Sequence, residues 1–169
     1  TSLRAACYLQ ELIPDLKIIV SMRAGADCPY TSALAQSALT VEFGPVSNNV
    51  VATSLVKSMH DLINKVLSFD FKQNYNYEKI ECYQVFGIQS YPEQGGWMIH
   101  QDVDVHDFNA LKSGDPIFTN INDEEITYKG ENTIYPLFVN EAAYQENNTA
   151  MEVALKTTLH RAISKIHTP

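Results

Sequence analysis

Three side chains that could take part in chemistry follow one apolar stretch near the C-terminus. Asn140, Glu141 and Tyr144 supply an amide, a carboxylate and a phenol directly after residues 134–139. Both alternating faces of that stretch are apolar, which predicts a strand that is buried on two sides. Because buried polar groups are costly unless they are paired, these three side chains form either a capped turn or part of a site.

A second candidate is Glu42, a carboxylate with apolar neighbours. It stands between Val41 and Phe43 in a predicted strand, residues 39–43, which ends at Gly44 and Pro45. Ligands of α/β sheets gather at the carboxyl ends of strands, and a carboxylate in an apolar setting suits general acid or base chemistry. The alternative is that Glu42 points to solvent from an alternating strand.

The segment 100–106 carries a third set of polar side chains. His100, Asp102, Asp104 and His106 would share one face of a strand, because side chains alternate along strands. Histidine and carboxylate can bind zinc, manganese or iron. Metal ligands usually come from different elements, so we interpret this segment as a solvent-exposed strand face and predict no metal ligand in it.

Composition excludes several classes of function. The chain has 169 residues, a formal net charge of -8 and 45% hydrophobic residues, enough for one domain or two small ones. No basic patch for nucleic acid and no apolar run long enough for a membrane are present. Three cysteines without metal-site spacing are typical of a reducing compartment and favour a cytoplasmic location. The start at Thr1 indicates a fragment.

Periodicity divides the chain near residue 72. Residues 1–72 are expected to hold a helix at 3–13, a strand at 16–22, the strand at 39–43 and a helix at 50–71. These are too few elements for a complete α/β domain. Residues 73–169 alternate short apolar segments with turn signals, which predicts a small β barrel or sandwich with Trp97, Phe118, Leu137 and Val139 in its core. The tail, 151–160, fits a strand or a helix.

Three segments resemble the aspartoacylase family. They are Val41-Glu-Phe-Gly-Pro45, Gly114-Asp-Pro-Ile-Phe118 and Ile134-Tyr-Pro-Leu-Phe-Val-Asn-Glu-Ala-Ala-Tyr144, in the order of the family. Its members are zinc-dependent amidohydrolases related to succinylglutamate desuccinylases and, more distantly, to zinc carboxypeptidases. The resemblance implies an α/β (α+β) fold, in which 1–72 supply the closing strands and helix of a carboxypeptidase-like α/β layer. Residues 73–169 would then form a mainly β subdomain capping the active-site channel, with a strand near 151–160.

The resemblance also implies residue roles. Glu42 would be the catalytic base and acid, and Glu141, Tyr144 and Tyr30 would bind the substrate, a small N-acyl amino acid such as N-acetylaspartate. The family holds zinc with a His-x-x-Glu pair and a third histidine, which this chain lacks. Zinc is therefore expected in the full-length protein, together with a missing N-terminal region, and this chain alone should bind none and be inactive.

Two departures from the family bear on the substrate. Ser32 stands where some members have an arginine, and Gln145-Glu-Asn-Asn148 stands where some have lysines. Both disfavour a dianionic substrate. The alternatives are a succinylglutamate desuccinylase-like or other N-acyl amino acid deacylase, and a non-catalytic β module that binds a ligand or partner. The sequence does not decide whether the protein forms a homo-oligomer.

Overall fold

The chain divides into two compact units in the computed structural model. One unit comprises residues 1–18 and 23–80, and the other comprises residues 19–22 and 81–169. The structure describes residues 2–21, 38–44, 46, 50–70, 72–94, 96–104 and 107–164. No helix in these ranges is long and apolar enough to cross a membrane.

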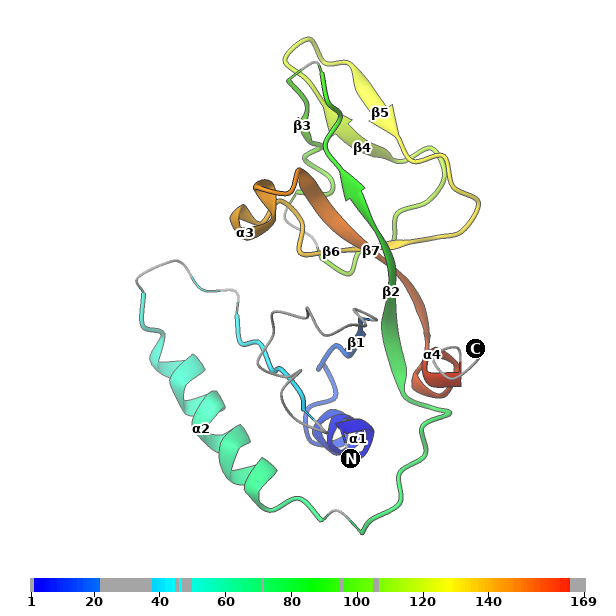
Figure 1. The fold of residues 1–169 in the computed structure, drawn as a ribbon. Coiled ribbons are helices and arrows are strands. Elements are labelled where there is room, and N and C mark those ends of the chain that lie inside the picture. The colour runs from blue at the N-terminus through cyan, green and yellow to red at the C-terminus, as the bar shows by residue number, and fades with distance from the viewer. Residues whose placement is uncertain are drawn as a thin grey trace. The chain divides into compact units, whose positions relative to one another are not determined.

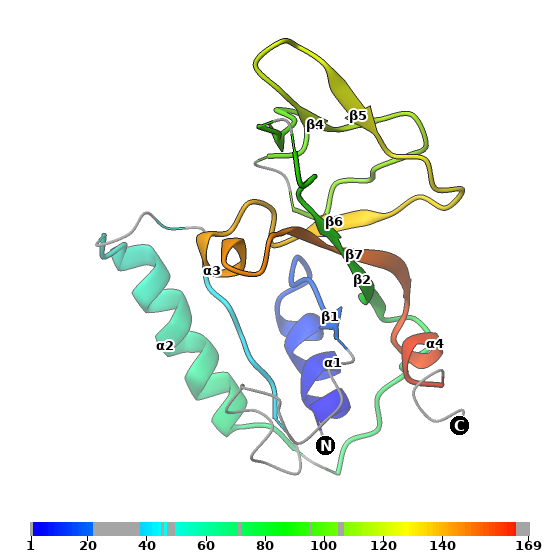
Figure 2. The ribbon, with the colours of Figure 1, turned by 45° about the horizontal axis from the view of Figure 1, so that its top comes forward.

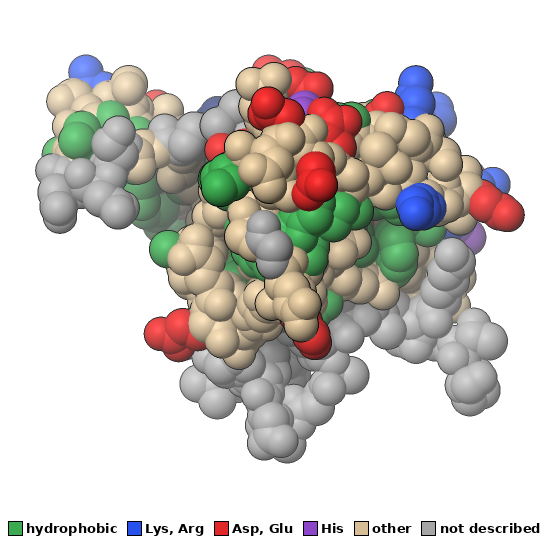
Figure 3. Space-filling model, turned by 90° about the horizontal axis from the view of Figure 1, so that it is seen from above, with side chains coloured by type: hydrophobic (Ala, Val, Ile, Leu, Met, Phe, Trp, Pro, Cys, Tyr) green, Lys and Arg blue, Asp and Glu red, His purple; other side chains and the backbone are tan. Residues whose placement is uncertain are grey.

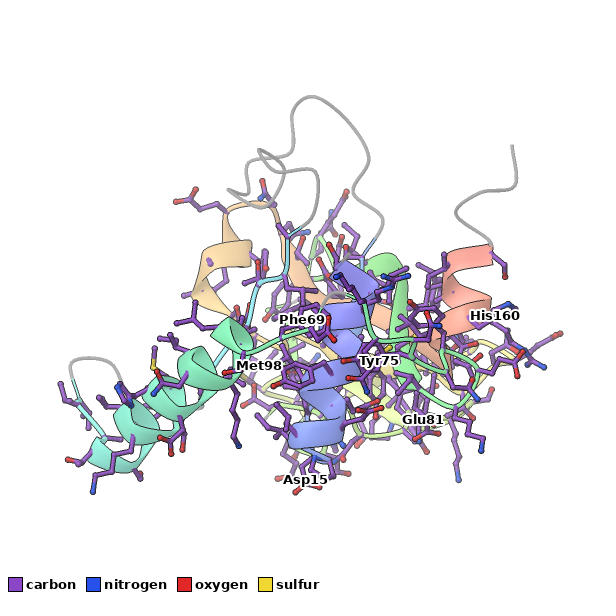
Figure 4. The ribbon with its side chains drawn as sticks, turned by 90° about the horizontal axis from the view of Figure 1, so that it is seen from below. Asp15, Phe69, Tyr75, Glu81, Met98 and His160 are labelled. Carbon is purple, nitrogen blue, oxygen red and sulfur yellow. The ribbon has the colours of Figure 1, made fainter. Side chains whose placement is uncertain are left out.

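The first unit contains the two longest helices. They are α1, Ser2–Leu12, and α2, Thr53–Leu67. Pro14 follows α1 closely and has no amide hydrogen with which to continue it. Phe69 lies beyond α2, with its ring centroid 5.1 Å from that of Tyr8 on α1 and 6.1 Å from that of Tyr75. This aromatic cluster lies against α1 (Figure 4). Both predicted helices are therefore confirmed, α2 with shorter bounds.

The strand predicted at residues 39–43 is wrong. Residues 38–44 are described, and they belong to no helix or strand. The strand predicted at 16–22 is reduced to β1, Ile19–Val20. A strand requires a hydrogen-bonded neighbour, and a β-branched pattern alone does not provide one.

The second unit is built from two sheets of described strands (Figure 1). The four-stranded sheet has the order β1-β2-β7-β6, with β1 parallel to β2 and the other pairs antiparallel. The three-stranded antiparallel sheet has the order β3-β4-β5. The bounds are Glu81–Ser90 for β2, Met98–Ile99 for β3, Pro116–Thr119 for β4, Glu125–Thr127 for β5, Tyr135–Leu137 for β6 and Thr149–Thr158 for β7.

The predicted core of the β unit agrees with the observed burial. Phe118 and Leu137 are almost fully buried, each in its own hydrophobic cluster. Trp97 and Val139 are partly buried and pack against the cluster that contains Phe118. Residues 134–137 have buried or half-buried side chains on both faces, as the apolar alternation predicts.

The ambiguous tail contains both predicted elements in succession. β7 extends to Thr158, and α4, Leu159–Ser164, begins at the next residue. Buried side chains occupy consecutive positions from Thr149 to Ala154, as expected for a strand covered on both faces. Leu159 and Ala162 are buried on α4 at helical spacing.

Both described thiols should resist modification in the folded protein. Cys7 and Cys82 are free and have no solvent-exposed surface. Burial raises the pKa of each from 9.0 to about 11. At pH 8 a thiol of that pKa is about one-thousandth thiolate, the reactive form. In a Cys28→Ser variant, Ellman's reagent should therefore react with these thiols at least about 100-fold more slowly than in guanidinium chloride.

The same pKa shifts make part of the stability depend on pH in the alkaline range. The folded state holds these two protons more tightly than the unfolded state does. The contribution of the thiols is thus complete below about pH 9 and falls as pH rises towards about 11. Rapid labelling of both thiols in the native protein at pH 8 would contradict the burial described here.

Candidate functional site

Glu141 and Tyr144 lie on one short structural segment. After β6, the chain passes through Phe138, Val139 and Asn140. It then enters the short helix α3, Ala142–Gln145, whose N-cap residue is Glu141. Figure 2 shows α3 between the ends of β6 and β7. Tyr144 is half buried and Glu141 is exposed. The structure therefore brings these two predicted site residues together within one turn.

The entry to this turn is unusual in its backbone. Phe138 and Asn140 have positive φ values, 53° and 57°. A bulky residue such as phenylalanine pays about 1–2 kcal/mol for this left-handed conformation. The Asp107 carboxylate accepts hydrogen bonds from the amides of Phe138 and Val139, at 3.0 and 3.1 Å. A carboxylate over two consecutive amides therefore holds the turn in place.

Asn140 joins three parts of the β unit. Its amide nitrogen donates to the Asp104 carboxylate at 2.7 Å, and its side-chain oxygen accepts from the Tyr91 hydroxyl at 2.8 Å. Its backbone amide donates to the Ala150 carbonyl at 2.9 Å. Burial and the nearby Asp104 charge raise the pKa of Tyr91, so its hydroxyl stays a hydrogen-bond donor. The Asn140 side chain thus ties the turn to two other segments and does not cap it, and Glu141 at the N-cap makes no side-chain capping hydrogen bond.

Glu42 belongs to the first unit and is exposed. Its neighbours Val41 and Phe43 are half buried, so the three side chains alternate without forming a strand. They line a groove of about 470 Å³. The rest of its lining is Ile13, Asp15, Leu16, Gly44, Leu55, Ser58, Asp61, Leu62 and Lys65. The groove lining is thus mixed apolar and charged, and Glu42 is exposed, as the solvent-facing alternative predicted.

The solvent-exposed strand face predicted for residues 100–106 is wrong over the described residues 100–104. Residues 101–104 make turns, and the strand β3 ends at Ile99. His100 is buried, with Nδ1 3.6 Å from the Asp102 carboxylate and Nε2 3.4 Å from that of Glu125. His106 lies outside the described residues. His100 is therefore a buried histidine between two carboxylates and is not part of an alternating polar strand face.

In Figure 3, Asp and Glu side chains are visible around a hydrophobic patch.

The described residues do not fit a zinc ion. Among them, no group of three or more His, Cys, Asp or Glu side chains is arranged to hold a metal. Structural and catalytic zinc both need three or four such ligands. Tyr30 and Ser32 lie outside the described residues.

Sequence patterns missed the residues that support the turn. Asp107, Asp104 and Tyr91 are 31 to 49 positions from their partners in the turn. Single carboxylates in a loop give no periodic signal, and only their contacts distinguish them. Asp104 was noted in the sequence, but as part of the metal-like row.

The fold places the β unit in a known class of domain. Residues 78–156 match the AstE/AspA barrel-sandwich hybrid domain. Murine aminoacylase 3 has a similar structure, with a TM-score of 0.79, 26% identity, and coverage of 93% of this chain and 56% of the murine chain. The protein is thus of the mixed α/β, carboxypeptidase-like class with a C-terminal barrel-sandwich domain.

Two relatives identify the family more closely. A probable aspartoacylase of Acaryochloris marina is 28% identical over 159 residues, covering 89% of this chain and 54% of the relative. The human N-acyl-aromatic-L-amino acid amidohydrolase (carboxylate-forming) is 30% identical over 161 residues, covering 89% of this chain and 50% of the relative. This chain belongs to the aspartoacylase and succinylglutamate desuccinylase family and covers its C-terminal portion. It spans about half the length of these relatives.

Proposed function

We propose that this chain is the C-terminal part of a zinc-dependent amidohydrolase that cleaves the linear amide of an N-acyl amino acid. The products are a carboxylate and a free amino acid. The observation that carries the proposal is the similarity to murine aminoacylase 3 over 93% of the chain, supported by amidohydrolase relatives of two kinds.

The roles of individual residues are part of the proposal. Glu42 accepts a proton from the attacking water and returns it to the leaving amine. Glu141 and Tyr144 line the substrate channel from α3, and Tyr30 contributes from the loop before Glu42. Residues 1–72 form the closing part of the α/β layer, and residues 73–169 cap the channel. Because the described residues do not fit zinc, its ligands would come from a preceding N-terminal region.

The surface of α2 supports such a region. Val56, Met59, Ile63 and Val66 recur at helical spacing and are 41–55% exposed. A helix stripe of this kind normally faces a core. We propose that the preceding part of the α/β layer covers it. A cytoplasmic location is proposed as well, because the two buried free thiols suit a reducing compartment.

The choice of substrate follows from charge. The segment after Tyr144 carries the exposed Glu146 in place of lysines, and it offers no cation to a second substrate carboxylate. N-acetylaspartate would place two carboxylates in the channel, whereas an N-acetylated aromatic amino acid has one. We therefore propose a monoanionic N-acyl amino acid as the better substrate and N-acetylaspartate as the weaker one.

The full-length protein tests this function directly. Free amine release would be measured with N-acetylaspartate, N-acetylphenylalanine, N-acetyltyrosine and N-succinylglutamate, alongside zinc analysis. The 169-residue chain serves as the comparison. We expect hydrolysis and about one zinc per chain in the full-length protein, and neither in the shorter one. Absence of hydrolysis of every substrate by zinc-loaded full-length protein would favour a non-catalytic binding module.

Replacing Tyr144 by phenylalanine should weaken catalysis moderately. The change removes one hydrogen bond to the substrate, worth about 0.5–1.5 kcal/mol when both partners are neutral and more when one is charged. In the full-length enzyme kcat/KM should fall about tenfold or somewhat more. Tyr77→Phe is the control, because this change also removes one hydroxyl but lies outside the proposed channel. Equal kcat/KM values for Tyr144→Phe and the unmodified enzyme would exclude Tyr144 from substrate binding.

A further inference from the structure

We infer that Asp107 is a positioning residue that fixes the side chain of Tyr144 through the backbone and ring of Phe138. The inference rests on the proposed role of Tyr144 in substrate binding. It adds a residue from a separate loop, on which the geometry of that tyrosine depends. Asp107 would not contact the substrate. It would act on Tyr144 only through the backbone of the turn.

Asp107 contacts the turn through both oxygens of its carboxylate. One carboxylate oxygen accepts the Phe138 amide at 3.0 Å, and the other accepts the Val139 amide at 3.1 Å. Both oxygens are thus used on consecutive amides. The loop bearing Asp107 is itself attached to β6, because the Phe108 amide donates to the Pro136 carbonyl at 2.9 Å. The carboxylate is therefore held at a fixed height beside the strand.

These two hydrogen bonds maintain an uncommon backbone conformation at Phe138. Phe138 has φ 53°, which a phenylalanine adopts rarely and only when its surroundings compensate. A charged acceptor that binds the Phe138 amide and the next amide together favours this conformation over extended backbone. Without the carboxylate, Phe138 should relax to negative φ, and its side chain would then leave in another direction.

The ring of Phe138 in turn contacts the ring of Tyr144. Their ring centroids are 6.0 Å apart, with the planes at 58°. This is a contact distance and tilt at which aromatic rings attract each other. Tyr144 lies on α3, a helix of only four residues, which by its length provides little rigidity of its own. The Phe138 ring is therefore one support for the direction of the Tyr144 ring.

The Asn140 network supports the same turn from its other side. Asn140 contacts Asp104 and Tyr91 through its side chain and Ala150 through its backbone. These contacts fix where α3 begins, but none of them reaches Phe138 or Tyr144. Asp107 and Phe138 therefore influence the orientation of the Tyr144 ring. Asn140 fixes the position of α3.

The first experiment uses the 169-residue chain and needs no enzymatic activity. Chains with isotope-labelled phenylalanine and tyrosine would be examined by NMR for the nuclear Overhauser effect between the Phe138 and Tyr144 rings. Asp107→Ala should remove this signal and shift the Tyr144 resonances, and Asp107→Asn should do so in part. Asp115→Ala is the matched control, because its carboxylate also accepts a backbone amide, that of Lys112 at 2.7 Å, in the same unit. It should leave the ring signal intact.

A second variant separates positioning from simple stabilisation. Glycine adopts positive φ without strain, so Phe138→Gly with Asp107 intact should keep the turn while removing the supporting ring. It should therefore shift the Tyr144 resonances as Asp107→Ala does. Unchanged Tyr144 resonances in Asp107→Ala, with only a lower unfolding midpoint, would overturn the inference and leave Asp107 a purely structural residue.

The full-length enzyme then distinguishes this inference from the proposed function. Asp107→Ala should lower kcat/KM about tenfold, as Tyr144→Phe does, and combining the two changes should lower it no more than about twofold further. Independent, multiplying losses would show that Asp107 acts by another route and would overturn the inference. Absence of any hydrolysis by the unmodified enzyme would refute the proposed function, while the NMR result would still decide whether Asp107 positions Tyr144.

Discussion

Glu42→Gln should abolish turnover by the full-length protein while zinc content and substrate binding stay nearly unchanged. Glutamine keeps the size of the side chain and one hydrogen-bonding oxygen, but it cannot accept a proton from water. Loss of a general base typically costs about 10²–10⁴-fold in rate. Because the same carboxylate would also protonate the leaving amine, the upper end of that range is expected.

The measurement is steady-state kcat, with zinc analysis and calorimetric titration of a substrate analogue on the same samples. Glu93→Gln is the matched control, because Glu93 is an exposed glutamate of the β unit outside the proposed machinery. Glu42 is exposed, and its groove is lined by apolar side chains together with charged ones, among them Asp61 and Lys65. A Glu42→Gln enzyme with near-normal kcat would show that Glu42 is not the base.

Phe118→Ala should produce the largest loss of stability in the β unit. Phe118 is 1% exposed on β4, opposite Ile99 on β3 and Ile126 on β5. Its ring centroid is 5.8 Å from that of Tyr91. Truncating a buried phenylalanine costs about 3–5 kcal/mol, because the lost burial and the cavity both count. For a unit of this size the midpoint of thermal unfolding should fall by about 12–40 °C.

Fluorescence of Trp97 provides a local signal, because this single tryptophan packs against the same cluster. Ile121→Ala is the control, since Ile121 follows β4 closely but is 85% exposed. That change should alter the free energy of unfolding by less than about 0.5 kcal/mol. If Phe118→Ala unfolds within about 1 kcal/mol of the unmodified chain, Phe118 does not anchor the core as the structure indicates.

Local patterns in the sequence determined the type of each long element. The apolar spacing of residues 50–71 predicted α2, and the two-sided apolar run 134–139 predicted the buried β6. Both signals arise within one element, because helix and strand periodicity depend on which faces are buried. The same applies to Phe118 and Leu137, whose burial was predicted from short apolar segments between turns.

Prediction failed where an element depends on distant partners. Residues 39–43 have a strand pattern, yet the structure places them in no sheet, since a strand forms only against a neighbouring strand. Residues 100–104 have alternating polar side chains, yet they turn after β3, with the Val103 and Asp104 amides donating to the His100 carbonyl. A local pattern cannot show whether a pairing strand is available.

The candidate site divides in the same way. The types and order of Glu42, Glu141 and Tyr144 were apparent from short segments, because each segment is local. Only the tertiary structure revealed that Asp107, more than thirty residues before the turn, holds Phe138 at positive φ beside Tyr144. The sequence thus determined which groups are present, and chain folding decided how they are held, because a hydrogen bond depends on distance in space and leaves no trace in residue spacing.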